Sequence, residues 1–285
     1  MILISVSTRN RFWNFALTML CLANAEKPAG ILLHLIDDAT DDGSLDDKRR
    51  IIECLGDATN STGWLHTRFE HLPERNGVNG VMSRFLDHVI RADATGNGGE
   101  AVTHWIHLDD DLVFSPDVLR RAIEDYERYL RRGLVYLFMN EWVKPLSHCN
   151  GPLWSVHELG GAAFITSRRT VQSIGNPFAD DAVRRGPCEQ IWERYRAAGE
   201  TLAFNRDEPY QIQHTANADS LIFGKQPRWA NLWSKDLRTN EFIDVPPYGF
   251  AEVRAAVDSG QLEKFVREAN ERAKFKLPLP ERKFS

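Results

Sequence analysis

The sequence predicts an α/β fold with a largely parallel central sheet. Short apolar runs alternate with stretches whose apolar residues recur at helical spacing, and two of these runs end in clusters of aspartates. The 285 residues are 42% hydrophobic and 26% charged, which is typical of globular chains. Parallel sheets bind ligands outside the carboxyl ends of their strands, so both aspartate clusters are expected to face one binding region.

The first half of the chain gives the clearer pattern. We expect strands at 2–6, 31–36, 64–72 and 102–108, and helices at 12–25, 47–55, 79–92 and 116–130. Ser115 is expected to cap the last of these helices, with Pro116 in its first turn and Asp117 near the positive end of its dipole.

The second half is less regular. We expect short strands at 134–139, 162–165, 201–204 and 210–214, a helix at 189–198, and one or two helices within 250–275. Gly199 should end the helix that precedes it. Residues 215–240 are polar with interspersed tryptophans and show no clear period, and 276–285 have the composition of a tail.

Composition and motifs weigh against several classes of protein. A net charge of −5 argues against a protein whose main task is gripping a nucleic-acid backbone. The four cysteines form no C-x-x-C pair, which indicates reduced thiols rather than zinc or redox chemistry. No apolar run approaches the roughly 20 residues of a membrane span, so a cytoplasmic protein is expected. Walker, dinucleotide-binding and nucleophile-elbow motifs are absent from the sequence.

The strongest chemical signal is Asp109-Asp110-Asp111, directly after an apolar strand. Three adjacent carboxylates repel one another and call for a cation. Mg²⁺ and Mn²⁺ prefer carboxylate oxygens together with substrate phosphates. Asp109 and Asp111 can both turn toward one ion on a loop. A solvated acidic turn that caps the following helix is the alternative.

Asp37 and Asp38 form the second signal, because they end the strand before an acidic loop that holds Asp41, Asp42 and Ser44. A carboxylate at a strand end can accept hydrogen bonds from a base edge or a ribose hydroxyl. An acidic loop of turn-forming residues explains the same pattern without a ligand.

Taken in order, these segments resemble the landmarks of GT-A-fold glycosyltransferases, especially the broad family 2 group. The resemblance covers roughly residues 1–214. It rests on 4–10, 35–40, 76–80 with Arg84, 108–111 with Pro116-Asp117, Gly160-Gly161-Ala162, and 188–199. It implies a GT-A-type single domain with a Rossmann-like, mostly parallel sheet flanked by helices. The catalytic domain would span 1–245, with a nucleotide-binding half at 1–115 and an acceptor half at 116–245, and 246–285 would be a C-terminal helical extension and tail.

The resemblance also implies roles for individual residues. The nucleotide-sugar donor, with a UDP-sugar favoured, would be bound by Ser7, Arg9, Asp38, Arg84, Asp109 and Asp110. A divalent cation, Mn²⁺ or Mg²⁺, would be held against the diphosphate by Asp109 and Asp111 of the DxD motif, and His214 would be a further ligand. The activity would be that of a hexosyl- or N-acetylhexosaminyltransferase.

The acceptor side departs from the family pattern. Inverting members use the second carboxylate of an E-D pair as general base, and Gln190 stands at that position. Glu189 and Asp181, with Asp180 beside it, are the candidate carboxylates for catalysis or acceptor binding. The stretch from Glu189 to His214 also resembles the retaining polypeptide N-acetylgalactosaminyltransferases, although these carry an Asp-x-His motif. Stereochemistry stays open, with retention slightly favoured, because a retaining enzyme needs no general base of the usual type.

Two segments are expected to border the site. The first segment has two interpretations that the sequence favours equally, a lid that closes over the diphosphate and a surface strip packed against the domain. Its basic and aromatic residues are Lys225, Arg228, Trp229, Trp233, Lys235 and Arg238. Acceptor contact or core packing are alternatives for Trp142, His148, Trp154 and His157.

Other function classes and the acceptor stay open. A nucleotidyltransferase predicts a glycine-rich loop after the first strand, which residues 7–11 lack. A non-catalytic carbohydrate- or protein-binding module is favoured only by Gln190. The acceptor is left open among protein, glycan, small molecule and modified nucleobase.

Overall fold

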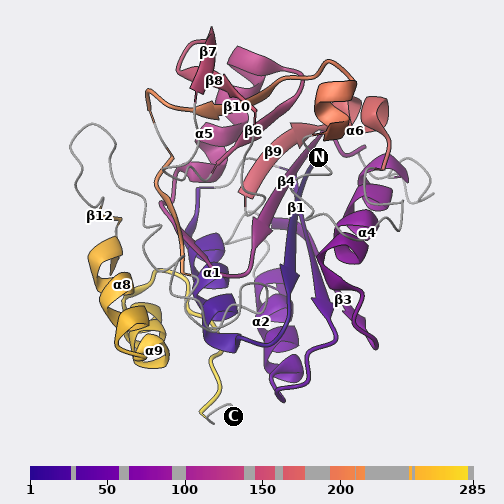
Figure 1. Cartoon of the computed structure of the whole chain (residues 1–285). Coiled ribbons are helices and arrows are strands. Elements are labelled where there is room, and N and C mark those ends of the chain that lie inside the picture. Colours follow the sequence, from indigo (N-terminus) through magenta and orange to yellow (C-terminus); the bar gives the residue numbers. More distant parts are fainter. Residues whose placement is uncertain are drawn as a thin grey trace.

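A computed structural model shows a nine-stranded sheet with helices on both faces (Figure 1). It describes residues 1–26, 30–57, 64–91, 101–137, 145–157, 163–176, 193–208, 210–215, 244–245 and 248–281. None of the helices in these ranges has the length and apolar character needed to cross a membrane.

The amino-terminal half of the sheet is parallel, as expected. Its strands lie in the order β3 (Trp64–Leu72), β2 (Ile31–Asp38), β1 (Ile2–Thr8) and β4 (His104–Asp109). Because they are parallel, their carboxyl ends meet at one edge. Register places Ser7 opposite Asp109 and Thr8 opposite Asp37, so the two aspartate clusters are neighbours there.

The other half of the sheet is mixed. β9 (Ala163–Ser167) runs antiparallel between β4 and β6 (Leu134–Tyr136). The sheet then continues through β10 (Leu202–Asn205) to an edge hairpin of β8 (Leu153–Val156) and β7 (Pro145–Asn150).

Two small sheets complete the strands. β5 (Leu112–Phe114) pairs with β11 (Ile212–His214), which brings the chain near residue 214 back beside the acidic cluster. β12 (Asp244–Val245) pairs with β13 (Tyr248–Gly249).

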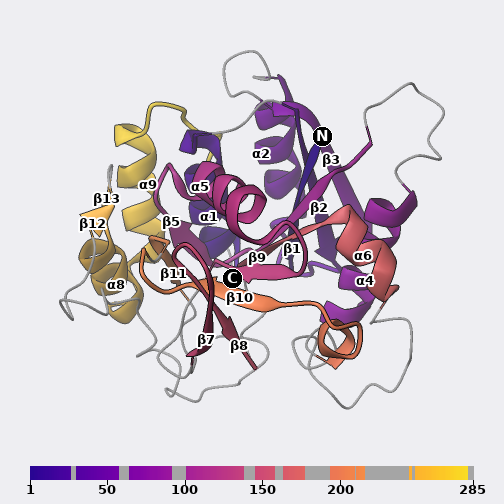
Figure 2. The same ribbon diagram turned by 90° about the horizontal axis from the view of Figure 1, so that it is seen from above.

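The helices divide between the two faces of the sheet (Figure 2). α1 (Phe12–Asn24), α2 (Leu45–Asp57) and α5 (Val118–Asp125) share one core, and α4 (Gly77–Arg91) and α6 (Arg168–Ile174) share the other. α4 buries Val81, Phe85 and Val89, which lie four residues apart and so form one apolar stripe. α1 is buried along nearly its whole length because it is covered by the sheet, α2 and α9.

The carboxyl-terminal segment forms two helices, α8 (Phe250–Asp258) and α9 (Leu262–Arg272). α9 packs on α1. The chain after it is tied to the end of α1, where the Phe275 backbone N–H donates to Asn24 Oδ1 at 2.9 Å. The expected helices within 250–275 are therefore confirmed.

The expected cap by Ser115 is wrong. The helix begins at Val118, with Asp117 in the cap position and no side-chain cap. Ser115 Oγ instead donates to the Asp117 carboxylate. The helical run continues as one π-helical turn, η1 (Tyr126–Leu130), a change of winding that apolar spacing does not reveal.

Candidate functional site

Two groups of polar side chains lie at the carboxyl edge of β1, β2 and β4, one on each face of the sheet. Side chains alternate between faces along a strand. Ser7, Asp38 and Asp109 therefore lie on the α4 face. Thr8, Asp37 and Asp110 belong to the α1–α2 side, where a buried network connects them.

Asp109 is the most accessible carboxylate of the triple, with 34% of its side chain exposed. His107 Nε2 lies 3.3 Å from Asp109 Oδ1, and His107 Nδ1 lies 3.0 Å from Ser5 Oγ. Trp105 Nε1 donates to that same hydroxyl at 2.7 Å. We therefore assign the Ser5 proton to His107 Nδ1 and the ring proton to Nε2, facing Asp109. The buried imidazole thus fixes the direction of a partly exposed carboxylate.

Asp38 lies at the start of α4. Its two carboxylate oxygens accept the backbone N–H groups of Asn76 at 2.6 Å and Gly77 at 2.9 Å. A carboxylate at a helix N-terminus satisfies donors that have no partner within the helix and complements the dipole. Asp38 therefore fixes α4 against the end of β2, and its side chain is 7% exposed.

On the opposite face, Lys48 of α2 is fully buried among oxygen acceptors. Its Nζ donates to Thr8 Oγ1 at 3.0 Å, to Thr40 Oγ1 at 2.9 Å and to Asp37 Oδ2 at 3.3 Å. All three ammonium protons have an acceptor, which a buried charge requires. Burial lowers the pKa of Lys48, and the charges of Asp37 and Asp110 oppose that shift.

Asp37 is equally buried and is held ionised by its partners. Burial alone raises the pKa of its carboxyl, but the Lys48 charge and two hydrogen bonds from Thr40 outweigh burial, so the pKa lies below its ordinary value. His71 Nδ1 adds a further contact at 3.0 Å. Asp37 therefore anchors the network rather than facing a ligand.

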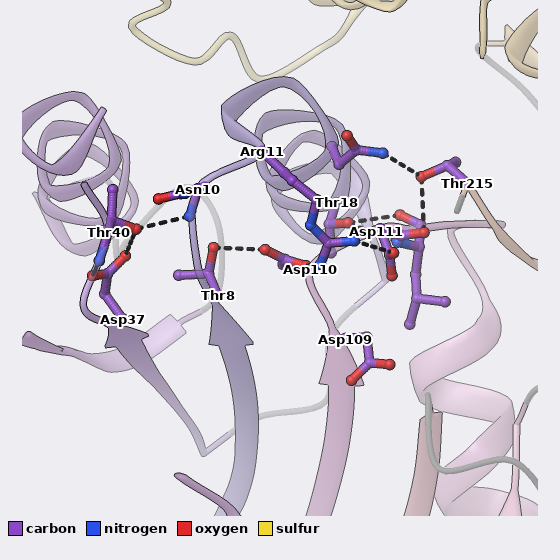
Figure 3. A network of polar contacts seen from close by, with 12 residues as sticks. Thr8, Asn10, Arg11, Thr18, Asp37, Thr40, Asp109, Asp110, Asp111 and Thr215 are labelled. Atoms are coloured by element: carbon purple, nitrogen blue, oxygen red, sulfur yellow. Dashed lines mark hydrogen bonds and ion pairs between the residues drawn. The ribbon is translucent and has the colours of Figure 1, made fainter. Parts of the chain in front are cut away.

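Arg11 supplies the cation that the acidic triple calls for. Its NH1 donates to Asp111 Oδ2 at 2.7 Å and its NH2 to Asp110 Oδ1 at 2.5 Å (Figure 3). Thr8 Oγ1 donates to the other Asp110 oxygen at 2.7 Å and links the pair to Lys48. Burial lowers the pKa of Arg11, but the charges of Asp110 and Asp111 reverse that effect and raise it.

The turns that carry these groups are strained. Asn10 and Arg11 have φ of 50° and 49°, and Ala39 in the next turn has φ of 59°. Residues other than glycine in this region cost of order 1 kcal/mol each and persist where the surroundings hold them. Here the Asn10 N–H donates to Thr40 Oγ1 at 2.9 Å, which ties the two turns together.

Two of the predicted donor-binding residues form ion pairs of their own. Arg9 pairs with the exposed Asp41 at 3.5 Å. Arg84 pairs with Glu70 of β3 at 2.8 Å and lies seven residues into α4, about 10 Å from the helix start. The structure does not place Arg84 beside Ser7 and Asp109, and its contact with a nucleotide stays a prediction.

His214 is brought to the acidic cluster by its backbone. It pairs with Leu112 across β5 and β11, and the next residue, Thr215, donates its N–H to the Asp111 carbonyl at 2.7 Å. The side chain of His214 is outside the described part of the structure, so its role as a metal ligand stays a prediction.

The acceptor-side candidates Glu189, Asp181, Asp180 and Gln190 lie outside the described residues, as do Trp142 and the basic, aromatic segment from Lys225 to Arg238. Of the predicted aromatic contacts, Trp154 is described. The Arg206 guanidinium lies 4.5 Å from its ring centroid, and the His148 ring lies 5.5 Å away. Trp154 is half-buried, so packing accounts for part of it; His157 is exposed.

A divalent cation is compatible with the chemistry of this edge, though no assembled site is present among the described residues. No group of three His, Cys, Asp or Glu side chains there is arranged to hold a metal ion. Asp110 and Asp111 nevertheless already hold a positive group, the Arg11 guanidinium, in their carboxylate oxygens. Such hard oxygen donors suit Mg²⁺ and Mn²⁺.

The chain is similar in structure to several solved glycosyltransferases, of which three are described. GalNAc-T7 in complex with UDP, GalNAc and Mn²⁺ is 12% identical, with a TM-score of 0.53 over 81% of this chain and 47% of that one. S. aureus TarS is 12% identical, with a TM-score of 0.51 over 76% of this chain and 37% of that one. The mannosyltransferase PcManGT from Pyrobaculum calidifontis, in complex with GDP-Man and Mn²⁺, is 13% identical. Its TM-score is 0.48 over 71% of this chain and 56% of that one. GalNAc-T7 and TarS, the two with a TM-score above 0.5, are GT-A-type glycosyltransferases. The protein has the GT-A fold.

The GT-A assignment concerns architecture. The sequence matches no family model and no curated protein. The chain spans about half the length, or less, of the two structures above a TM-score of 0.5. The expected α/β class and the GT-A resemblance are confirmed.

Sequence reasoning missed two residues that organise this edge of the GT-A fold, Arg11 and Lys48. A signal for Lys48 was present, because it lies at helical spacing from Ile51, Ile52 and Leu55, on the apolar face of α2. Arg11 follows β1 directly, so it stands at a strand carboxyl end, but no local pattern indicates that it reaches residues 110 and 111.

Proposed function

We propose that the protein is a glycosyltransferase that moves a hexosyl or N-acetylhexosaminyl group from a nucleotide sugar, UDP-linked, to an acceptor hydroxyl. The observation that carries the proposal is the partly exposed carboxylate of Asp109, opposite Ser7 and two strands from Asp38, at the carboxyl edge of a GT-A fold. Ligands of open α/β sheets bind at such an edge.

The proposed roles follow from what each side chain offers. Ser7 provides a hydroxyl, and the Asp38 carboxylate retains lone pairs for a ribose or base donor after accepting two backbone N–H groups. Asp109 would face the sugar diphosphate, with its direction set by His107. Arg9 and Arg84 are the proposed contacts to the nucleotide. Each would leave its present ion pair with a carboxylate and bind a phosphate or the base.

The proposed cofactor is Mn²⁺ or Mg²⁺. GalNAc-T7, which shares the fold, is described with UDP and Mn²⁺. Asp109 and Asp111, with His214, would hold the ion, and Asp110 would support them from the buried side. When bound, the ion offsets the negative charge that develops on the departing diphosphate.

On the acceptor side, Glu189 and Asp181 are the proposed carboxylates, and Gln190 favours retention of anomeric configuration. Proton NMR of the first-formed product distinguishes the outcomes by its anomeric coupling constant. An α-linked product from a UDP-α-sugar supports retention, whereas a β-linked product contradicts it.

A thermal-shift screen tests the function directly. UDP-Glc, UDP-Gal, UDP-GlcNAc, UDP-GalNAc and GDP-Man are each added with Mn²⁺ or with excess chelator. We expect one UDP-sugar to raise Tm by several degrees with Mn²⁺, because a ligand at 100 times its Kd stabilises the folded state by about 2.7 kcal/mol. The matched Asp109→Asn variant should lose that shift.

Turnover separates the alternatives. If the bound UDP-sugar releases UDP slowly in water and faster when an acceptor is added, the result supports a transferase. Pyrophosphate release from a nucleoside triphosphate would instead indicate a nucleotidyltransferase. Metal-dependent nucleotide binding without hydrolysis or transfer would indicate a non-catalytic binding module.

A further inference from the structure

One guanidinium bridges two of the three adjacent carboxylates. Arg11 contacts Asp111 through NH1 and Asp110 through NH2, so each carboxylate gives one oxygen to it. Both carboxyl side chains are almost fully buried, whereas 22% of the Arg11 side chain is exposed. The cation is thus the member of this cluster with a route to solvent.

The charges around this bridge do not balance. The hydrogen-bonded network contains the carboxylates of Asp37, Asp110 and Asp111, and Asp109 adds a fourth beside it. The cations in it are Arg11 and Lys48. Among these named groups the carboxylates outnumber the cations, and a divalent cation would reduce that excess of negative charge.

The Arg11 side chain is bound incompletely in its present position. Its Nε–H is buried and makes no hydrogen bond within the described part of the chain. Its backbone has φ of 49°, next to Asn10 with φ of 50°. A buried donor without an acceptor and a left-handed backbone each cost about 1 kcal/mol or more. Of the two, the unpaired Nε–H can be relieved by moving the side chain, and it reduces the free energy needed to displace it.

Asp110 does not depend on Arg11 alone. Its second oxygen accepts from Thr8, whose hydroxyl oxygen accepts from the buried Lys48. Displacing Arg11 removes its NH1 from Asp111 Oδ2, where an incoming cation can then bind, while Asp110 keeps a link to a resident positive charge.

We infer that Arg11 is a built-in counter-cation that competes with a divalent ion for the Asp111 carboxylate and so weakens metal binding by the donor-free protein. The identity of the competing ion, Mn²⁺ or Mg²⁺, rests on the proposed function. A diphosphate gives the displaced guanidinium a new bidentate partner. Metal and donor binding are consequently coupled, and each strengthens the other.

The test measures Mn²⁺ binding to donor-free protein from the electron paramagnetic resonance signal of free Mn²⁺. Arg11→Gln alone leaves two adjacent buried carboxylates, Asp110 and Asp111, without the cation they share and threatens folding. We therefore compare Asp110→Asn with the double variant Arg11→Gln/Asp110→Asn, in which the remaining amide can still accept from Thr8. Arg91→Gln, which removes an exposed charge at the end of α4, is the control for net charge.

We expect the double variant to bind Mn²⁺ about tenfold more tightly than Asp110→Asn, because a positive charge within contact distance of Asp111 is gone. We also expect UDP to tighten Mn²⁺ binding less in the double variant than in Asp110→Asn. Arg91→Gln should match the wild type.

Equal or weaker Mn²⁺ affinity in a folded double variant overturns the inference, as does the absence of Mn²⁺ binding in both variants. Neither result decides the proposed function, which rests on turnover of a nucleotide sugar by the wild type. Conversely, tighter Mn²⁺ binding with no transfer to any acceptor sustains the competition by Arg11 and counts against the transferase.

Discussion

Single residues at the sheet edge carry charges that ordinarily stay in water. Lys48 and Asp37 are fully buried and form one network with Thr8 and Thr40. Burying two ions is costly unless each finds partners in good geometry. The network therefore holds the turns after β1 and β2 in place only while all its members are present.

Replacing Lys48 tests that dependence. Lys48→Met keeps the side chain's length but leaves Asp37 as an uncompensated buried charge, so we expect a loss of about 3–5 kcal/mol in the free energy of unfolding. Urea denaturation followed by circular dichroism measures it. Lys264→Met is the matched control, because that lysine is exposed and pairs with the exposed Glu268, and it should change stability by less than about 1 kcal/mol. Similar losses in the two variants would contradict the account.

His34 of β2 makes stability depend on pH. Burial, with Arg68 and His88 nearby, lowers its pKa to about 3, and neither ring nitrogen has a hydrogen bond among the described residues. The unfolded chain takes up a proton near pH 6.5 and the folded chain does not. The contribution of His34 to stability is therefore full above pH 6.5 and falls toward pH 3 by ~1.4 kcal/mol per pH unit.

His34→Leu removes this titration and keeps an apolar contact with Phe85. The loss in unfolding free energy between pH 7.5 and 5.0 should shrink by about 2 kcal/mol relative to wild type. His66→Leu, on an exposed ring of β3, should leave that loss unchanged. An undiminished loss in His34→Leu would refute the assignment.

Among the elements, α4 depends on a side chain from β2. Asp38 accepts the N–H groups of Asn76 and Gly77, so the sheet edge and the helix start form one unit. Asp38→Ala should cost about 1–2 kcal/mol of stability, as for loss of a helix cap. Asp46→Ala, in the exposed first turn of α2, should cost less than about 1 kcal/mol. Equal small effects in urea denaturation would contradict the role of Asp38.

At this scale the sequence predicted much of the first half, where each apolar run became a strand and each 3.6-residue pattern a helix. Ser115 shows the limit of such local patterns. A serine before a proline is typical of a helix cap, but the Val118 N–H donates to the backbone carbonyl of Ser115 and not to its hydroxyl. The hairpin of β7 and β8 was missed because β7 is exposed at the sheet edge and carries no apolar alternation.

For the whole molecule, the sheet separates two tasks. The α4 face carries the partly exposed Asp109, and the α1–α2 face carries the buried ions that fix the turns. The sequence predicts Asp109 and Asp38 at one edge of the sheet, because each follows an apolar run that marks the end of a strand. It did not predict that Arg11 holds Asp110 and Asp111, because that contact joins residues about a hundred positions apart.

The central claim is that a sugar nucleotide is bound at this edge with its diphosphate against Asp109 and Asp111. A crystal structure of the protein soaked with the best UDP-sugar and Mn²⁺ tests it most directly. We predict ion density between the diphosphate and the Asp109 and Asp111 carboxylates, the nucleoside beside Ser7 and Asp38, and Arg11 moved from Asp111 to phosphate. A donor bound elsewhere, with Arg11 still bridging Asp110 and Asp111, would contradict the account.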